Sequence, residues 1–422
     1  MPVNYLNRII DKILDDYLKS FGAVLIEGPK WCGKTTTAAI KSKTIIKLQD
    51  PRKSKDYLKL AEISPVSLLE GDTPILIDEW QMAPVLWDAI RAEVDDRNLK
   101  GQFILTGSSV PMDGKTMHSG TGRIARLLMR PMSLFESLES NGRVSLAKLF
   151  SDNIMPQGEI CALSLKGIAQ AICRGGWPSS IYADNADPSL VAQDYLNSIC
   201  ESDISRVDGI EKNPNRVRSI IQSYSRNIST LATNKTIMDD VEANDMSISE
   251  ATFYSYLNAL SRLFVIEDIP AWNPAIRSKT VIRSSHKKAF VDPSLAAAAL
   301  GLSTENIFDD MNTFGFLFES LCIRDLRIYA STLNGKVFYY RDRYGLECDA
   351  VIRLNNGDFG LVEIKMGESE IESGARHLLK MKKLITEKGM KNPFFLMILT
   401  TGQLAYTRKD GVKVVPIGCL GI

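Results

Sequence analysis

The feature that most constrains the fold is a glycine-bounded loop between an apolar strand and a helix near the start of the chain. Residues 23–28 read AVLIEG, PKWCGKT follows, and residues 34–42, KTTTAAIKS, have a helical pattern. The spacing G-x-x-x-x-G-K-[ST] lets backbone amides turn inward around an anion, and the following helix directs its N-terminal dipole at that anion. The spacing therefore predicts a phosphate-binding loop at the edge of a parallel α/β sheet.

The side chains of this loop match what a nucleoside triphosphate needs. Lys34 would reach the β- and γ-phosphates of ATP, and the Thr35 hydroxyl would hold Mg²⁺. An ordinary glycine-containing turn shows the same pattern, so neighbouring motifs must decide between the two interpretations. If the loop binds ATP, the expected contacts are Gly28, Pro29, Lys30, Trp31, Cys32, Gly33, Lys34, Thr35 and Thr36.

A second apolar strand, in TPILIDEWQ at 73–81, ends in two acids. Asp78 at such a strand end would order the water shell of Mg²⁺. Glu79 would polarise the attacking water. Two carboxylates after a buried strand are costly unless a cation or water receives them. A surface turn is the alternative, but the loop about 45 residues upstream favours an ATPase.

A third apolar strand, in GQFILTGSS at 101–109, runs into small hydroxyl residues. Ser108 is positioned to hydrogen-bond the γ-phosphate or the attacking water. Ser108 and Ser109 would equally serve as helix caps. Next to the two preceding motifs, we interpret Ser108 as a sensor of the γ-phosphate.

Three arginines follow within SGTGRIARLLMRPMSLFE, at 119–136: Arg123, Arg126 and Arg130. A guanidinium suits a γ-phosphate because its fork of donors spreads charge over several oxygens. We take Arg123 as the candidate arginine finger, acting in its own subunit or on a neighbour. Action on a neighbour would require a homo-oligomer, and a monomer with a solvated basic edge is the alternative.

These motifs occur in a fixed order, ending with RGGWPSS at 174–180. In this order the chain resembles, over essentially its whole length, a large group of bacterial and archaeal AAA-type P-loop ATPases. Their C-terminal domain is of unknown function and is similar to restriction endonucleases. The resemblance implies that Gly28, Lys34 and Thr35 bind nucleotide, Asp78 binds Mg²⁺, Glu79 is the base and Ser108 is the sensor.

The end of the chain has the element order of the restriction-endonuclease-like core. From 311 onward a helix, three strands, a helix and a strand follow one another, an αβββαβ order. Asp349 lies in the second strand, and Glu363 and Lys365 end the third as an ExK motif. Two carboxylates on adjacent strands would hold Mg²⁺ at a scissile phosphate, and the lysine would stabilise charge there. Glu319 in the first helix is a further candidate metal ligand, and the alternative is a solvated Glu–Lys pair.

The expected α/β organisation has five parts. They are an N-terminal helix at 1–20, an AAA-type P-loop ATPase domain at 21–150, a helical segment at 151–233, a winged-helix-like segment at 234–290 and a restriction-endonuclease-like domain at 291–422. Residues 271–290 contain five basic residues and no acid: Arg277, Lys279, Arg283, Lys287 and Lys288. This stretch is either a contact for DNA phosphates or a basic surface hairpin.

Composition restricts how the protein can contact nucleic acid or membranes and indicates the redox state of its cysteines. The formal net charge is only +1, so any contact with nucleic acid or membrane must be local. The seven cysteines form no CxxC pair, which predicts reduced thiols in a cytoplasmic protein, and no apolar run approaches a membrane span.

We therefore expect an ATPase, using ATP and Mg²⁺, whose nucleotide state controls a nuclease-like domain acting on DNA. Two alternatives remain: an ATPase switch whose C-terminal domain binds nucleic acid without cleaving it, and a nucleotide-gated protein-interaction module.

Overall fold

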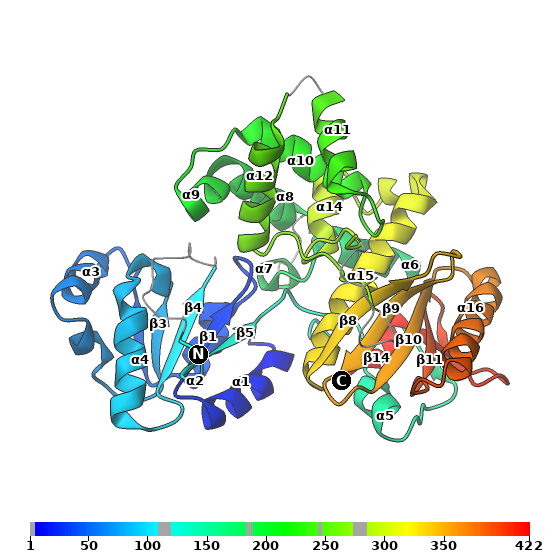
Figure 1. Ribbon diagram of the computed structural model, residues 1–422, viewed down its shortest axis with the longest axis horizontal. Helices are drawn as coiled ribbons and strands as arrows, with labels where there is room; N and C mark the ends of the chain where they lie inside the picture. Colours follow the sequence, from blue (N-terminus) through cyan, green and yellow to red (C-terminus); the bar gives the residue numbers. More distant parts are fainter. Residues whose placement is uncertain (1–4, 109–119, 183–186, 188, 244–246, 273–284) are drawn as a thin grey trace. The chain divides into compact units, whose positions relative to one another are not determined.

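The computed structural model describes residues 5–108, 120–182, 187, 189–243, 247–272 and 285–422. The chain forms two compact units, whose elements are labelled in Figure 1. Unit 1 comprises Met1–Pro131, Glu201–Lys212 and Ser255–Val265, and unit 2 comprises Met132–Cys200, Asn213–Tyr254 and Ile266–Ile422. The predicted α/β class is confirmed, with a parallel sheet in unit 1, a helical middle part of the chain and a mixed sheet in unit 2.

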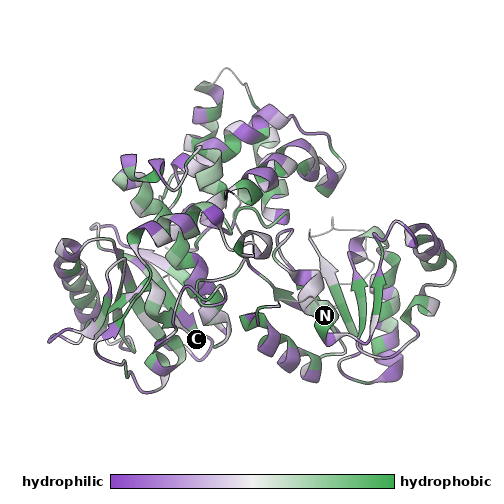
Figure 2. Ribbon diagram, turned by 180° about the vertical axis from the view of Figure 1, so that it is seen from behind, coloured by the Kyte–Doolittle hydropathy of each residue, from purple (hydrophilic) through white to green (hydrophobic). Residues whose placement is uncertain are grey.

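Unit 1 is built on a parallel sheet with the strand order β2-β3-β4-β1-β5. Its strands are apolar on both faces because helices cover both, and Figure 2 shows them in the green of hydrophobic residues. Ala23 and Leu25 of β1 face the core under α3 and α4, whereas Val24 and Ile26 face the core under α1 and α2. The strands are β1 (Ala23–Glu27), β2 (Thr44–Lys47), β3 (Ile75–Asp78), β4 (Phe103–Gly107) and β5 (Ile124–Leu128).

The helices of unit 1 connect these strands or pack beside them. They are α1 (Ile9–Ser20), α2 (Lys34–Lys41), α3 (Ser54–Ile63), η1 (Pro65–Leu69), η2 (Trp80–Met82), α4 (Val85–Arg97) and α9 (Ile204–Asp208). The helix α12 (Glu250–Arg262) contributes to this unit from Ser255 onward. The predicted N-terminal amphipathic helix is confirmed as α1, which buries Ile9, Ile10 and Leu14.

Unit 2 contains the predicted αβββαβ order. The strands β8, β9 and β10 are antiparallel neighbours, α16 follows, and β11 lies parallel to β10. The helix α16 covers one face of this sheet through Ile371, Leu378 and Met381. The relevant bounds are α15 (Met311–Ser331), β8 (Gly335–Arg341), β9 (Glu347–Leu354), β10 (Phe359–Lys365), α16 (Glu368–Glu387) and β11 (Leu396–Thr400).

The sheet of unit 2 extends beyond this core, with the order β7-β12-β13-β11-β10-β9-β8. The added strands are β7 (Glu159–Ile160), β12 (Leu404–Thr407) and β13 (Lys413–Pro416), and β6 (Val144–Ser145) pairs separately with β14 (Leu420–Gly421). The other helical elements of the unit are α5 (Leu146–Ser151), α6 (Leu165–Arg174), α7 (Pro178–Ile181), α8 (Leu190–Ser198), α10 (Pro214–Arg226), α11 (Asn234–Ala243), α14 (Pro293–Ala299), η4 (Asn306–Asp309) and η5 (Ile417–Cys419). The turn η3 (Ile199–Asp203) spans a boundary between the units.

The first domain boundary lies earlier in the chain than the sequence suggested. We expected the ATPase domain to reach residue 150, but the first segment of unit 1 ends at Pro131, and unit 2 begins at Met132. The following segment joins the C-terminal sheet, because β6 pairs with β14 and β7 pairs with β12. The Ser140 hydroxyl also donates to the Leu420 carbonyl at 2.6 Å. The segment from Met132 to residue 150 therefore belongs to unit 2 and not to the ATPase unit.

The predicted basic stretch is only partly described, and the described part is not a basic surface. Arg277, Lys279 and Arg283 lie outside the described residues. Lys287 and Lys288 are buried, and the Lys288 ammonium pairs with Asp268 at 3.1 Å. The prediction of a basic surface was therefore wrong for these two lysines, because both are buried and pair with the partly buried carboxylates of Glu319 and Asp268.

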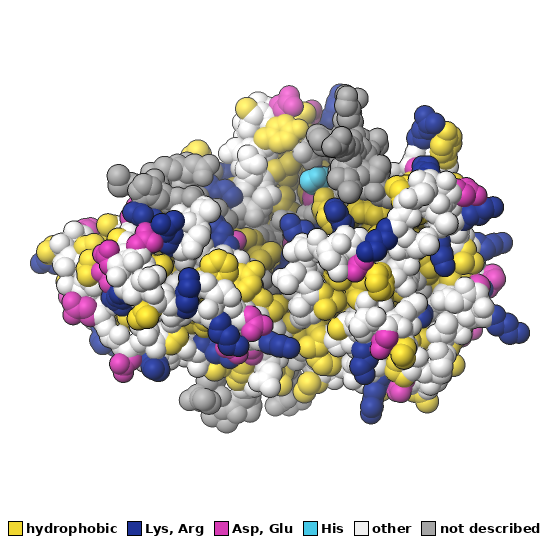
Figure 3. Space-filling model, turned by 60° about the horizontal axis from the view of Figure 1, so that its bottom comes forward, with side chains coloured by type: hydrophobic (Ala, Val, Ile, Leu, Met, Phe, Trp, Pro, Cys, Tyr) yellow, Lys and Arg dark blue, Asp and Glu magenta, His cyan; other side chains and the backbone are white. Residues whose placement is uncertain are grey.

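The surface shows no single field of charge on the face that Figure 3 draws, where basic and acidic side chains are interspersed. All seven cysteines are buried free thiols. Among the described helices, none combines the length and the apolar character needed to cross a bilayer.

Candidate functional site

The phosphate-binding loop joins β1 to α2, and two of its positions require glycine. Gly28 has φ +150°, and a Cβ atom there would lie 2.1 Å from the Met129 carbonyl oxygen. Gly33 has φ 103° and directly precedes the first turn of α2. Glycine tolerates this backbone conformation at no steric cost, so the sequence folds locally into the loop that its spacing predicted.

The side chain of Lys34, the predicted phosphate-binding lysine, is held inside the loop. Lys34 is 5% exposed, and its ammonium donates to the carbonyls of Gly28 at 2.9 Å and Pro29 at 2.7 Å. An ammonium on a flexible stem can turn from these carbonyls to phosphate oxygens.

The hydroxyl and carboxylate expected to hold Mg²⁺ lie in direct contact. The Thr35 hydroxyl donates to Asp78 Oδ1 at 2.7 Å, and the Thr106 hydroxyl donates to the same oxygen at 2.6 Å. Mg²⁺ binds through one or two protein oxygens and completes its shell with water and phosphate. The Thr35 and Asp78 oxygens fit this ion.

Glu79 is oriented by three neighbours at the end of β3. Its amide donates to Thr106 Oγ1 at 3.2 Å. The Ser108 hydroxyl donates to Glu79 Oε2 at 3.1 Å, and the Gln81 amide donates to the same oxygen. Ser108 therefore lies beside the candidate base, a contact that the sequence did not predict. Its contact with the γ-phosphate or the attacking water stays a prediction, and Ser109 lies outside the described residues.

Gln81 was not predicted, although its place two residues after Glu79 was visible in the sequence. Its side-chain oxygen is buried and has no hydrogen-bond partner in the described part of the chain. Burying an acceptor without a hydrogen-bond partner costs folding free energy unless a water molecule donates to it. Glu79 and Gln81 together therefore offer acceptors for one water molecule.

Arg123 lies at the opposite edge of the sheet from the loop. Its carbonyl accepts from the amide of Ala23, the first residue of β1, whereas the loop follows the last residue of β1. A strand of this length spans roughly 13 Å. The guanidinium of Arg123 is half-exposed and pairs with Asp95 at 2.8 Å. The placement does not support a finger role in its own subunit, and two interpretations stay open: a role toward a neighbouring subunit and a solvated basic edge.

Arg126 lies closer to the loop. Its guanidinium pairs with Glu27 at 3.1 Å and lies 5.6 Å from the ring centroid of Trp87. Burial raises the pKa of Glu27, and the attraction of Arg126 opposes that rise without cancelling it.

The loop also contacts a segment far along the chain. The Lys30 ammonium pairs with Asp203 at 2.7 Å, and Asp203 is nearly buried. Asp203 ends η3, and Arg206 of α9 approaches it at 3.9 Å. No local sequence signal indicated this contact, because 173 residues separate the partners.

The predicted residues of the C-terminal domain also come together. Lys365 pairs with Glu363 at 2.7 Å and with Asp349 at 3.2 Å, so the D…ExK residues of β9 and β10 form one cluster. Glu319 joins from α15, and its partner is Lys287, which also lies 3.9 Å from Asp349. Lys287 was predicted as a surface charge, and its place in this cluster was not foreseen.

Burial and neighbouring charges shift the pKa values of this cluster in opposite directions. It raises the pKa of Glu363 to about 8, with the charge of Asp349 adding to the rise. It also raises the pKa of Glu319 to about 7. For Asp349 burial acts in the same direction, but Lys287, Lys365 and the Ile364 amide outweigh it, and the pKa falls below its usual value.

The cluster does not fit a divalent metal as it is arranged. In the described part of the chain, no three His, Cys, Asp or Glu side chains are placed to hold a metal ion. Ammonium groups instead of an open space face the carboxylates of Glu319, Asp349 and Glu363. The predicted metal-ligand role of these three residues therefore has no support in the geometry.

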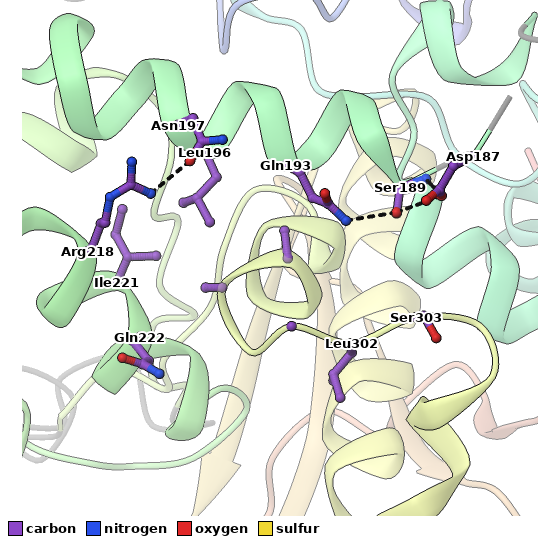
Figure 4. Close-up of a pocket in the computed structure, with 13 residues that line it drawn as sticks. Asp187, Ser189, Gln193, Leu196, Asn197, Arg218, Ile221, Gln222, Leu302 and Ser303 are labelled. Carbon is purple, nitrogen blue, oxygen red and sulfur yellow. Dashed lines mark hydrogen bonds between the residues drawn. The ribbon is translucent and has the colours of Figure 1, made fainter.

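Unit 2 also contains a pocket of about 510 Å³ that polar and apolar side chains line together, shown in Figure 4. In it, Arg218 of α10 donates to Asn197 at 2.8 Å, and Gln193 of α8 donates to Ser189 at 2.9 Å. None of the predicted site residues lines this pocket.

Comparison with known protein families supports the nucleotide site. Residues 20–138 match a family model described as an AAA domain, residues 165–306 match a domain of unknown function (DUF8612), and residues 314–420 match another domain of unknown function (DUF4143). The chain therefore contains an AAA-type P-loop ATPase domain followed by domains of undescribed function. This confirms the corresponding part of the resemblance seen in the motifs.

The proteins that are similar over most of the chain are uncharacterized and suggest no activity for it. The chain is 25% identical over 398 residues to the uncharacterized proteins Rv2008c of Mycobacterium tuberculosis and Mb2031c of Mycobacterium bovis, covering 93% of this chain and 79% of each relative. A solved structure, the Walker-type ATPase PABY2304 of Pyrococcus abyssi, aligns with 70% of this chain and 96% of its own, at 15% identity and a TM-score of 0.43. A likeness this distant supports no conclusion about the present chain.

Proposed function

We propose that the chain is an ATP-hydrolysing switch whose C-terminal domain does not cleave nucleic acid. The observation that carries the ATPase part is the contact of Thr35, Asp78, Glu79 and Ser108 at the loop end of the parallel sheet. The observation that carries the second part is the pairing of every carboxylate of the C-terminal cluster with a lysine.

Hydrolysis would proceed by attack of water on the γ-phosphorus of ATP. Glu79 would take a proton from the water as the new P–O bond forms, and the bond to the β-phosphate oxygen would break to release ADP. The Gln81 oxygen would orient that water, and Lys34 would balance the charge on the phosphates. Thr35 and Asp78 would hold Mg²⁺, which neutralises charge on the phosphate oxygens.

The Lys30–Asp203 pair offers a route from the nucleotide to the rest of the chain. Phosphates bound in the loop would attract the Lys30 ammonium and repel Asp203, since ATP carries several negative charges. Asp203 belongs to the short segment Glu201–Lys212 of unit 1, and the chain on either side of this segment, up to Cys200 and from Asn213, belongs to unit 2. ATP binding would therefore weaken a contact of unit 1 that lies close in sequence to a point where the chain passes to unit 2.

Phosphate release from ATP tests the first part of the proposal. The comparison uses wild type, Lys34→Ala, Glu79→Gln and Lys41→Ala, the last being a matched lysine on α2. We expect Lys34→Ala to lose nucleotide binding, Glu79→Gln to bind but turn over about 10²–10⁴-fold more slowly, and Lys41→Ala to match wild type. Wild-type turnover by Glu79→Gln would refute the assigned base.

A second candidate function is a Mg²⁺-dependent DNA endonuclease, favoured by the convergence of Asp349, Glu363, Lys365 and Glu319 in one cluster. Plasmid and linear DNA incubated with Mg²⁺ or Mn²⁺, with and without ATP, separates the two functions. Cleavage that disappears in Lys365→Ala would establish the nuclease; we expect no cleavage.

Contact of the 271–290 stretch with DNA stays a separate prediction. Three of the basic residues that would make this contact, Arg277, Lys279 and Arg283, lie outside the described part of the chain. DNA binding that weakens steeply with rising salt concentration would support the prediction.

Sedimentation with ATP would show whether the chain forms the homo-oligomer that a finger role of Arg123 requires.

A further inference from the structure

Lys287 enters the C-terminal carboxylate cluster from outside the αβββαβ core. It precedes that core in the chain and lies in a short extended segment whose backbone pairs with Ile269 through bonds of 2.9 and 2.8 Å. The neighbouring Lys288 pairs with Asp268, and the Tyr339 hydroxyl donates to the Ser285 carbonyl. Several independent contacts thus fix the backbone that carries Lys287.

The Lys287 side chain lies against the carboxylates of Glu319 and Asp349. Its ammonium contacts the Glu319 carboxylate and lies 3.9 Å from Asp349 Oδ1. Lys365 occupies the other side, at 3.2 Å from Asp349 Oδ2 and 2.7 Å from Glu363. The Ile364 amide also donates to Asp349 Oδ2 at 2.8 Å. Asp349 Oδ2 therefore accepts hydrogen bonds from two protein donors, and Oδ1 lies within ion-pair distance of Lys287.

The Lys287 ammonium and the Glu319 carboxylate are both largely shielded from solvent, because their side chains are 10% and 13% exposed. A divalent cation beside Glu319 and Asp349 would meet this ammonium at close range, and like charges in a buried site repel strongly.

We propose that Lys287 is a tethered counter-ion that takes the place of a divalent cation between Glu319 and Asp349, so that this cluster binds no metal in the native chain. The cluster then serves to fix the segment around Lys287 onto the C-terminal sheet. This inference rests on the non-cleaving part of the proposed function. It is independent of ATP hydrolysis, so either can fail alone.

Mn²⁺ binding to the nucleotide-free full chain, followed by electron paramagnetic resonance, tests the proposal. The variants are Lys287→Met, which keeps the aliphatic bulk, Lys287→Arg, which keeps the charge, and the double variant Lys287→Met/Asp349→Asn. Asp349→Asn in the wild-type background assigns any bound Mn²⁺ to this cluster or to the loop site.

We expect Lys287→Met to bind one Mn²⁺ more than wild type does, with an affinity of this cluster at least about tenfold above the upper limit found for wild type, since removing the ammonium removes a strong repulsion. Lys287→Arg should not gain it, and the double variant should lose it. A folded Lys287→Met chain that gains no Mn²⁺ overturns the proposal.

A measurement on wild type alone guards against an unfolded variant. Acetylation of Lys287 by an amine-reactive reagent, read by mass spectrometry, should stay slow whether or not Mn²⁺ is present. Acetylation of Lys287 in wild type that Mn²⁺ accelerates would show that the metal displaces the lysine, and would overturn the proposal.

Discussion

The Lys30–Asp203 pair makes the most direct prediction about how the nucleotide acts. The perturbation is a double-mutant cycle of Lys30→Met and Asp203→Asn, measured as the affinity for ATP. The charged atoms are 2.7 Å apart, which corresponds to about 6 kcal/mol at an effective dielectric constant of about 20. The Lys30 side chain is 35% exposed, so solvent screening and desolvation reduce the net value to about 1 kcal/mol.

If bound phosphates break this pair, its energy opposes ATP binding. Asp203→Asn should then tighten ATP binding about fivefold, which is the factor that corresponds to about 1 kcal/mol. The same substitution should tighten ATP binding less in the Lys30→Met background, because the pair is already absent there and only the direct repulsion between Asp203 and the phosphates remains.

The assay is titration with a slowly hydrolysed ATP analogue at low and high salt. Asp16→Asn is the matched control, since it removes one acid from an exposed pair with Lys19 on α1. Equal tightening by Asp16→Asn would attribute the effect to net charge. Additive effects of Lys30→Met and Asp203→Asn, or an unchanged affinity in Asp203→Asn, would refute the role of the pair.

Three further predictions follow from single contacts. Ser108→Ala should slow ATP turnover roughly tenfold with little change in KM, because it removes a hydrogen bond that orients Glu79; steady-state kinetics would show this. Arg126→Ala should lower the free energy of unfolding, measured with urea, by less than about 1 kcal/mol at pH 8, and by a smaller amount below about pH 4. Burial raises the pKa of Glu27, so the protein loses stability as the pH rises through this pKa and the buried carboxyl ionises. Arg126 attracts only the ionised carboxylate, so its removal matters at the higher pH. Arg324→Met should cost about 3–5 kcal/mol in unfolding of unit 2, because it strands the buried carboxylates that Arg324 pairs with at 2.8 and 2.9 Å; a cost below 1 kcal/mol would contradict this.

The sequence by itself determined the parts of both sites that lie at strand ends. The loop from Gly28 to Thr35 and the acids after β3 are encoded within short windows, by glycine conformation and apolar periodicity. In a parallel sheet these windows meet at one edge, so Thr35 and Asp78 were predictable neighbours. The alternation of side chains along β9 and β10 likewise placed Asp349, Glu363 and Lys365 together.

Only the tertiary structure decided which partner each charge receives. Lys287 and Lys288 looked like surface residues because a run of basic residues without acids is usually solvated, and nothing local indicated Glu319 or Asp268. Asp203 contacts Lys30 across 173 residues, and the segment after Pro131 completes the distant sheet of unit 2. Backbone periodicity is a property of neighbouring residues, whereas the partner of a buried charge depends on which distant elements the fold brings against it.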